Sequence, residues 1–353
     1  MKKLMVMVAA IAMLTGSAYA ADWDFYGSAR IGTFYTSGET IGSSAADVNN
    51  YNQYLQTNAR IGANVKVSDE LTGRFEYGTS GGNANIRLLY GTWTFGEGKL
   101  VVGQDYSPLN YLYSNQVGLG DGDGDANGLK HGGVYSGRAG QLKLVFGGFE
   151  AALVPVSQRN NGAAAIAPET KIPGLEVGYA MTFDNIALKL GGGYQTYDAK
   201  LANGQEESVT SYVIAGFGKI DLGAFYIAGN IYGGQNAGNM IAVDTDGDNS
   251  FGSNNGIATL TATQVQDSDV FGGLIAAGFV VNEMFSVEAG YGYVSTELDV
   301  ANSSKDKLQT YYLNSTVNLA PGVFIVPEIG VMDGEEDGDT KVTYGGIKWQ
   351  INF

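Results

Sequence analysis

The sequence predicts an all-β fold: a transmembrane barrel of sixteen antiparallel strands in a single domain. Three observations support this. Apolar and polar residues alternate with a period of two along many segments, which is the pattern of a strand with two unlike faces. Short turns alternate with long polar loops along the chain, as in outer-membrane barrels. Residues 1–20 have the composition of a secretory signal peptide.

The first 20 residues predict export. Two lysines at positions 2 and 3 precede an apolar stretch over 4–14, and Ala-Tyr-Ala at 18–20 forms a small-x-small cleavage site. An apolar run of about 11 residues is too short for a membrane helix, which needs about 20. We expect residues 21–353 to form the mature domain. Cleavage of the signal peptide would remove two of the 20 basic residues and leave 18 against 36 acidic ones. A mature protein this acidic argues against a nucleic-acid partner.

Four segments show the strand alternation well. In the first, Trp23, Phe25 and Ile31 share one face, while Asp24 and Arg30 share the other. The other three segments cover residues 55–67, 175–183 and 285–293. A soluble sandwich buries such apolar faces in a core, whereas a membrane barrel turns them toward lipid. Alternation alone does not separate the two.

Loop lengths favour the barrel. We expect short connectors near residues 68–72, 96–98, 138–140, 183–185, 219–222, 282–284 and 320–322. They alternate with longer polar segments near 37–52, 80–84, 106–131, 154–173, 199–206, 234–264, 297–306 and 333–340. This order joins sixteen strands, with short periplasmic turns and long extracellular loops. A barrel of that size keeps a water-filled lumen.

Composition excludes several classes of function. The chain has no Cys, which excludes a thiol nucleophile and a Cys-ligated metal. It has a single His, His131, which disfavours a His-based triad or metal centre. No acidic or Ser partner for His131 can be assigned from the sequence. We therefore expect no enzymatic activity and no required cofactor.

The C-terminal segment 340–353 gives an independent indication of the outer membrane. Its alternation puts Trp349, Ile351 and Phe353 on one face, and the chain ends on an aromatic residue. This arrangement resembles the signal that outer-membrane barrels present to the barrel-assembly machinery. We expect these three residues to act as that signal.

Several short motifs occur in order near the two ends of the chain. They are Asp-Trp-Asp-Phe-Tyr-Gly at 22–27, Ala-Arg-Ile-Gly at 59–62, Leu-Thr-Gly-Arg-Phe-Glu-Tyr at 71–77, Gly-Thr-Trp-Thr-Phe-Gly at 91–96, Val-Val-Gly-Gln at 101–104 and the terminal Phe353. Together they resemble the Gram-negative general porins. The resemblance implies a homotrimer of 16-stranded barrels in outer-membrane lipid and lipopolysaccharide. It also implies a third loop folded into each lumen, and passive diffusion of small hydrophilic solutes and ions.

Candidate pore-lining residues lie on the polar faces of the first strands. They are Arg30, Arg60 and Arg74, with Arg87 on the fourth strand. By resemblance, Arg60 matches a wall arginine that faces the third loop. Gln104 stands where many relatives have an arginine at the constriction. The third loop lacks the Pro-Glu-Phe-Gly-Gly stretch that such porins often carry.

The third loop carries acidic candidates for the opposite side of the pore. With arginines on one wall and Asp121, Asp123 and Asp125 on the loop, a transverse field would orient dipolar solutes. The alternative is that all these groups are ordinary solvated charges. Local charge in the lumen should set ion selectivity, because outer loop charges beyond a Debye length of about 8 Å are screened.

Two acidic runs have the D-x-D-x-D spacing of calcium loops. They are Asp121, Asp123 and Asp125, and Asp244, Asp246 and Asp248. Neither has the bidentate Glu at position twelve, where Gly132 and Asn255 stand. Solvated carboxylates, or carboxylates that bridge to lipopolysaccharide through divalent cations, explain the runs equally well. Ca²⁺ is therefore a candidate ligand only.

Two other functions stay open. A substrate-specific channel, for example one for anions or small organic acids, would carry a basic cluster or a row of aromatic residues in its lumen. The 22 Tyr could supply that row, although aromatic girdles at the membrane interfaces also use them. A structural surface barrel would have a blocked pore and long ordered loops, such as those expected at 106–131 and 234–264.

Overall fold

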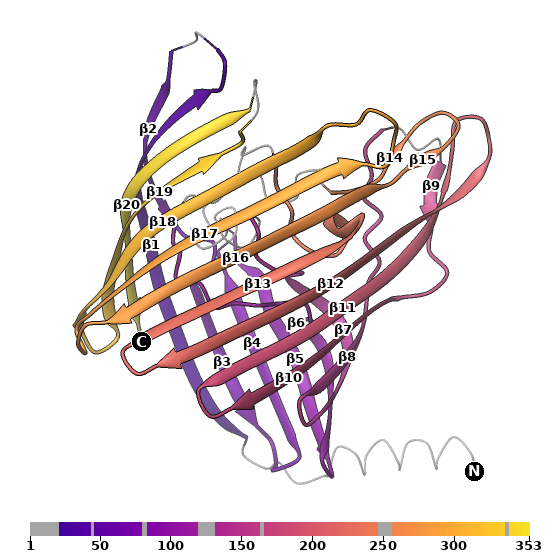
Figure 1. Cartoon of the computed structure of the whole chain (residues 1–353). Coiled ribbons are helices and arrows are strands. Elements are labelled where there is room, and N and C mark those ends of the chain that lie inside the picture. Colours follow the sequence, from indigo (N-terminus) through magenta and orange to yellow (C-terminus); the bar gives the residue numbers. More distant parts are fainter. Residues whose placement is uncertain are drawn as a thin grey trace, which may run out of the picture.

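A computed structural model describes residues 21–43, 46–79, 83–118, 131–162, 166–245, 256–335 and 339–353. Eighteen strands hydrogen-bond into one antiparallel sheet. β1 (Asp22–Thr40) pairs with β20 (Thr340–Asn352) on one side and with β2 (Val48–Leu55) and β3 (Arg60–Lys66) on the other, which closes the sheet into a barrel (Figure 1). Within the described residues, no helix is long and apolar enough to cross a membrane.

The barrel wall has sixteen strands, as predicted, because two of them are each built from two pieces. These are β2 with β3, and β9 (Ile166–Glu169) with β10 (Gly174–Phe183). The remaining wall strands are β4 (Leu71–Gly78), β5 (Asn85–Phe95), β6 (Gly98–Tyr106), β7 (Arg138–Phe146), β8 (Phe149–Val154), β11 (Ile186–Lys200), β12 (Glu206–Leu222), β13 (Phe225–Gln235), β16 (Ser268–Val280), β17 (Phe285–Leu298), β18 (Lys305–Ala320) and β19 (Val323–Asp333). The sixth loop holds η2 (Ala237–Asn239), β14 (Thr259–Leu260) and β15 (Val265–Gln266).

The outer face of the barrel is apolar. Along β1, Trp23, Phe25 and Tyr35 are exposed, whereas Ser28 and Phe34 on the other face are buried inside. The same alternation continues in the strands that follow, and it leaves a broad belt of exposed large hydrophobic side chains. An apolar belt outside a polar lumen is what a lipid environment requires of a membrane barrel.

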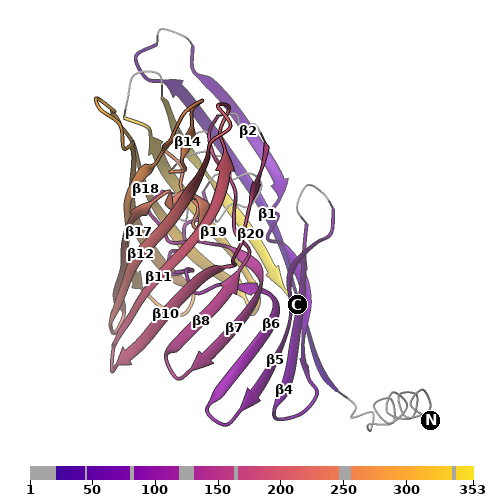
Figure 2. The ribbon, with the colours of Figure 1, turned by 90° about the vertical axis from the view of Figure 1, so that its right-hand side faces the viewer.

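The short turns lie at one end of the barrel and the longer loops at the other (Figures 1 and 2). Two predicted turns are misplaced. Residues 138–140 begin β7, and its turn is Gly147–Gly148, where Gly147 has a φ of 55°. β12 runs to Leu222, and its turn begins at Gly223, with a φ of 73°. Polar residues near a strand end have the composition of a turn, but in this barrel they belong to strands because a water-filled lumen accepts polar side chains on the inner face of the wall.

The third loop, between β6 and β7, folds into the lumen as predicted. Leu109, Tyr111 and Val134 from this loop pack against inward residues of β12, β13 and β16 in one buried hydrophobic cluster. Ile241 and Val243 from the sixth loop belong to the same cluster. The main core of the protein therefore lies between the third loop and one side of the barrel wall, and the other side is left to line the pore.

Candidate functional site

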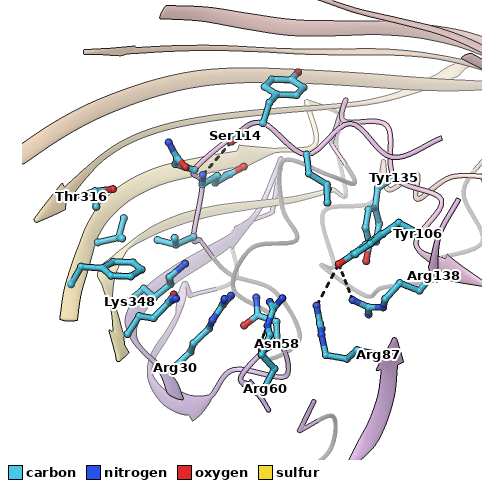
Figure 3. Close-up of a pocket in the computed structure, with 18 residues that line it drawn as sticks. Arg30, Asn58, Arg60, Arg87, Tyr106, Ser114, Tyr135, Arg138, Thr316 and Lys348 are labelled. Atoms are coloured by element: carbon cyan, nitrogen blue, oxygen red, sulfur yellow. Dashed lines mark hydrogen bonds between the residues drawn. The ribbon is translucent and has the colours of Figure 1, made fainter. Parts of the chain in front are cut away.

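A cavity of about 530 Å³ lies between the third loop and the opposite wall of the barrel (Figure 3). Its cations come from five different strands. They are Arg30 on β1, Arg60 on β3, Arg87 on β5, Arg138 on β7 and Lys348 on β20. The structure thus brings three of the four predicted arginines together. Arg74 on β4 lines a separate cavity with Asp22 and Asp24.

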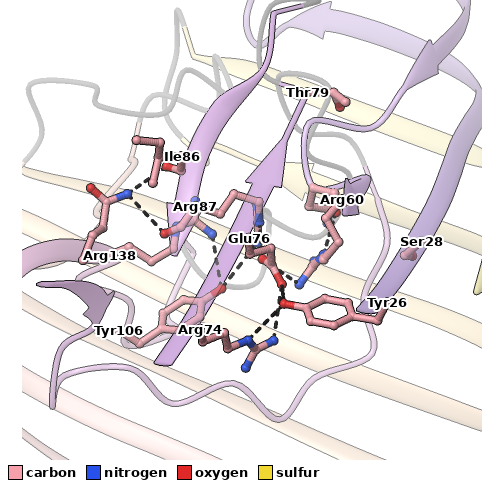
Figure 4. Close-up of polar contacts among 12 residues, drawn as sticks. Tyr26, Ser28, Arg60, Arg74, Glu76, Thr79, Ile86, Arg87, Tyr106 and Arg138 are labelled. Atoms are coloured by element: carbon pink, nitrogen blue, oxygen red, sulfur yellow. Dashed lines mark hydrogen bonds and ion pairs between the residues drawn. The ribbon is translucent and has the colours of Figure 1, made fainter. Parts of the chain in front are cut away.

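We call Arg30, Arg60, Arg87, Arg138 and Lys348 the basic wall. Glu76 on β4 bonds two members of this wall, Arg60 and Arg87, and also Arg74 (Figure 4). Its side chain is 1% exposed, and its Oε1 accepts hydrogen bonds from Arg87 Nε at 2.8 Å and Arg60 at 3.4 Å. Its Oε2 accepts from Arg74 at 3.3 Å and from the Tyr26 hydroxyl at 2.9 Å. One buried carboxylate therefore compensates three guanidinium groups that would otherwise repel one another.

Tyr106 at the end of β6 orients Arg138 and makes a second contact with Arg87. Its hydroxyl accepts from Arg138 at 3.2 Å and lies 3.5 Å from a terminal nitrogen of Arg87 (Figure 3). The Arg138 guanidinium also stands 5.5 Å from the Tyr106 ring centroid, in cation–π range. Two arginines on neighbouring parts of the wall are thereby positioned by one tyrosine side chain.

The interruption between β2 and β3 shapes the wall next to Arg60. Residues 56–59 leave the regular ladder, and Asn58 lines the cavity. The Asn58 carbonyl accepts from Arg60 Nε at 2.8 Å, while Arg30 Nε donates to Ser28 Oγ at 2.8 Å. Local polar groups therefore fix the direction of both side chains.

Three buried glutamates of the barrel wall bind the backbone of the third loop where it crosses the lumen. Each glutamate stands on a different wall strand and accepts one backbone N–H of the loop, which satisfies a donor that would otherwise be unpaired. The pairs are Glu176 on β10 with Leu109 at 3.1 Å, Glu288 on β17 with Asn115 at 2.7 Å, and Glu328 on β19 with Val117 at 2.7 Å. Residues 109–117 are thereby attached along the wall.

Tyr113 anchors the middle of this crossing. Its hydroxyl lies 2.7 Å from both Asn230 Oδ1 and the Leu274 carbonyl oxygen. Burial raises the pKa of Tyr113 well above its ordinary value, so the phenol stays a neutral donor. The loop is therefore held by backbone, carboxylate and phenol contacts on the side away from the arginines.

The charge around the cavity is one-sided. The lining residues that the structure describes include five cations and no carboxylate. The loop segment that faces the cations, Leu112 to Val117, is uncharged. Asp121, Asp123 and Asp125 lie outside the described residues, so the transverse field stays a prediction.

Gln104 has a different environment from the arginines. It pairs with Leu89 across β5 and β6, and its Nε2 donates to the carbonyls of Ile86 at 2.8 Å and Arg87 at 3.1 Å. Gln104 is not among the described residues that line the 530 Å³ cavity. It braces the irregular part of β5 from which Arg87 projects.

Of the six Asp residues that are calcium candidates, the structure describes only Asp244. Asp244 is fully buried and lies 3.3 Å from His131 Nε2, which links the sixth loop to the third. Asp246 and Asp248 fall outside the described residues. In the described ranges, no three His, Cys, Asp or Glu side chains gather as a metal site would require.

The candidate assembly residues lie on the outside of β20. Trp349, Ile351 and Phe353 are exposed, and the Phe353 backbone exchanges hydrogen bonds with Gly27 of β1. The C-terminus therefore lies at the seam that closes the barrel. Its role as an assembly signal stays a prediction.

Two cations of the basic wall, Arg138 and Lys348, and the carboxylate Glu76 bonded to it are not among the predicted site residues. Lys348 was detectable because it alternates with Trp349 on the polar face of the last strand. Glu76 shares a face with Arg74 in the motif at 71–77. Arg138 was hidden by the misplaced turn.

The closed barrel, its apolar belt and its inward-folded loop define a membrane channel. The model of the Gram-negative porin family matches residues 8–337. The chain belongs to that family, whose members are channel proteins, and it is an outer-membrane porin. No curated protein matches the sequence.

Solved structures share the fold at low identity. The outer membrane channel DcaP of Acinetobacter baumannii has a TM-score of 0.70 and 16% identity, over 96% of this chain and 99% of that chain. The trimer form of OmpT from Vibrio cholerae has a TM-score of 0.59 and 17% identity, over 94% and 99%. The anion-selective porin from Comamonas acidovorans has a TM-score of 0.60 and 12% identity, over 94% and 100%.

Proposed function

We propose that this porin is a passive channel with a preference for small anions. The observation that carries the proposal is the one-sided lining of the cavity, with five cations and no carboxylate among the described residues. Charges on the wall of a narrow, low-dielectric pore act on passing ions more strongly than they would in bulk water. Anions should therefore be concentrated at the constriction and cations repelled.

The acidic composition of the chain does not oppose this preference. The excess of Asp and Glu is a property of the whole chain, and charges further from the pore than about 8 Å are screened at physiological salt. Among the described residues, Glu76 is bonded to Arg60 and Arg87 of the basic wall, and 1% of its side chain is exposed. The Arg60 guanidinium, which is 20% exposed, is therefore more accessible to a permeating ion than the Glu76 carboxylate.

We propose that transport involves no chemical step. We also propose that the protein is a homotrimer in outer-membrane lipid and lipopolysaccharide, inserted by the barrel-assembly machinery. The trimer form of OmpT, a protein of the same fold, supports the oligomeric state. Binding of Ca²⁺ at 121–125 or 244–248 remains a prediction. The surface-structural alternative requires a blocked pore, which a conductance measurement would reveal.

A second candidate function is a substrate-specific channel for small organic anions. It is favoured by the clustering of Arg30, Arg60, Arg87, Arg138 and Lys348 around one cavity, which is the dedicated basic cluster that such a channel would need. The general and specific channels share the anion preference. They differ in whether the channel binds its solute measurably.

Solute flux through proteoliposomes tests the proposed function. Propionate, propionamide and propylammonium have nearly the same size and carry negative, zero and positive charge. We expect entry rates in that order, fastest for propionate. Equal rates would remove the anion preference, and a faster rate for propylammonium would reverse it. Three equal conductance steps per insertion in a planar bilayer would support the trimer, and absence of conductance would support the structural alternative.

A further inference from the structure

The cavity has an apolar side as well as a basic one. Leu112 on the third loop lines it and is 53% exposed. Phe324 on β19 also lines it, packed against the buried pair Val117 and Val326, which line the same cavity. Tyr113 adds a ring to the loop side. Apolar side chains from both the loop and the wall are unexpected in the lining of a pore that passes only hydrated ions.

The apolar lining is built into the fold. Val117 is fixed by the hydrogen bond from its amide to Glu328, and Val117 and Val326 belong to one buried cluster with Phe34 and Tyr344. Leu112 follows Tyr111 and precedes Tyr113, both of which are anchored to the wall. The attachments that hold the loop therefore also present Leu112 to the cavity.

We infer that the cavity is a binding site for carboxylates with an aromatic or branched apolar body. This inference rests on the proposed anion preference and names the class of solute that the same site favours. The carboxylate would lie against the arginines, and the apolar body would contact Leu112 and Phe324. A volume of about 530 Å³ is in the range of small-molecule sites, which combine a mainly apolar lining with a few polar groups that fix orientation.

The inference is tested by block of single-channel current. Benzoate and acetate carry the same charge and differ in the apolar body, so their half-blocking concentrations in wild-type protein can be compared directly. We expect benzoate to block at a concentration roughly tenfold lower than acetate, since burial of a ring removes much apolar area from water. Benzylammonium, which keeps the ring and reverses the charge, should not block. Equal concentrations for benzoate and acetate, or equal block by benzylammonium, would contradict the inference.

A matched pair of variants locates the contact. Leu112→Asn keeps the size of the side chain and should weaken benzoate block about fivefold, as expected for loss of roughly 40 Å² of apolar contact. Because acetate has no ring to contact residue 112, the ratio of the acetate to the benzoate half-blocking concentration should fall in this variant. Ile172→Asn is the control, because Ile172 is also 53% exposed, lies in the break between β9 and β10, and is not among the described residues that line the cavity. The inference fails if Leu112→Asn and Ile172→Asn behave alike.

The failure of this inference can be told apart from failure of the proposed function. If wild-type protein favours anions but does not distinguish benzoate from acetate, only the apolar subsite is wrong. If the protein does not favour anions at all, both are wrong. The comparison in wild-type protein decides the matter even if Leu112→Asn does not insert into membranes.

Discussion

The sharpest consequence of the basic wall concerns Glu76, and we predict the effect of Glu76→Gln in detail. The substitution keeps the shape and removes one negative charge that three arginines share. Removing one partner of a buried ion pair costs about 3–5 kcal/mol. Arg60 and Arg74 are 20% and 34% exposed and can turn toward water, whereas Arg87 is 4% exposed and cannot. We therefore expect the lower end, about 3 kcal/mol.

The control for this variant is Glu150→Gln. Glu150 also stands on the inner wall, but it pairs with one cation, Lys189 at 2.8 Å, and both side chains are about a fifth exposed. A pair of this kind contributes roughly 0.2–1 kcal/mol. Both variants remove one negative charge from the barrel interior. Only Glu76→Gln leaves several guanidinium groups without their shared acceptor.

Two assays read the result. The temperature at which the folded band disappears from a gel should fall clearly for Glu76→Gln and little for Glu150→Gln. The zero-current potential in a KCl gradient should move further toward chloride for Glu76→Gln, because the arginines of the wall gain effective charge. An unchanged unfolding temperature, or a shift toward potassium, would refute the role that we give Glu76.

Three further variants test the loop attachments. Glu288→Gln should weaken the hold on Asn115 and increase flicker in single-channel recordings, with a mean conductance close to wild type. Asp244→Asn should weaken the link to His131 and make the third loop more accessible to protease, and equal cleavage would contradict this link. Gly132→Ala should lower the yield of folded barrel, because Gly132 has a φ of 104° and an added Cβ would lie 2.0 Å from a backbone carbonyl of β16. Normal yield of Gly132→Ala would show that this close approach can relax.

The barrel could be predicted because its strands obey a local rule. Alternation places Trp23 outside and Arg30 inside without knowledge of any other strand, and the loop lengths then give the strand number. Turn positions were less secure. A charged residue beside Gly, such as Arg138, resembles loop sequence and predicts a turn, whereas in a water-filled barrel it is a normal inward residue of a strand.

The site could be predicted only in part, because its key contacts are tertiary. Alternation showed that Glu176 and Glu288 lie on polar faces, but their partners are loop amides more than 60 residues away in sequence. No local pattern indicates that Glu328 accepts a hydrogen bond from the Val117 amide, since every non-proline residue has the same backbone N–H. The path of the third loop across the lumen emerges only when the wall and the loop are seen together.

We propose above all that the basic wall of the constriction, rather than the acidic composition of the chain, sets ion selectivity. The most direct test is the sign of the zero-current potential of the wild-type protein in a planar bilayer under a KCl gradient. A potential of the sign given by faster chloride movement is the predicted result. A potential of the sign given by faster potassium movement would contradict the claim and show that acidic groups control the pore.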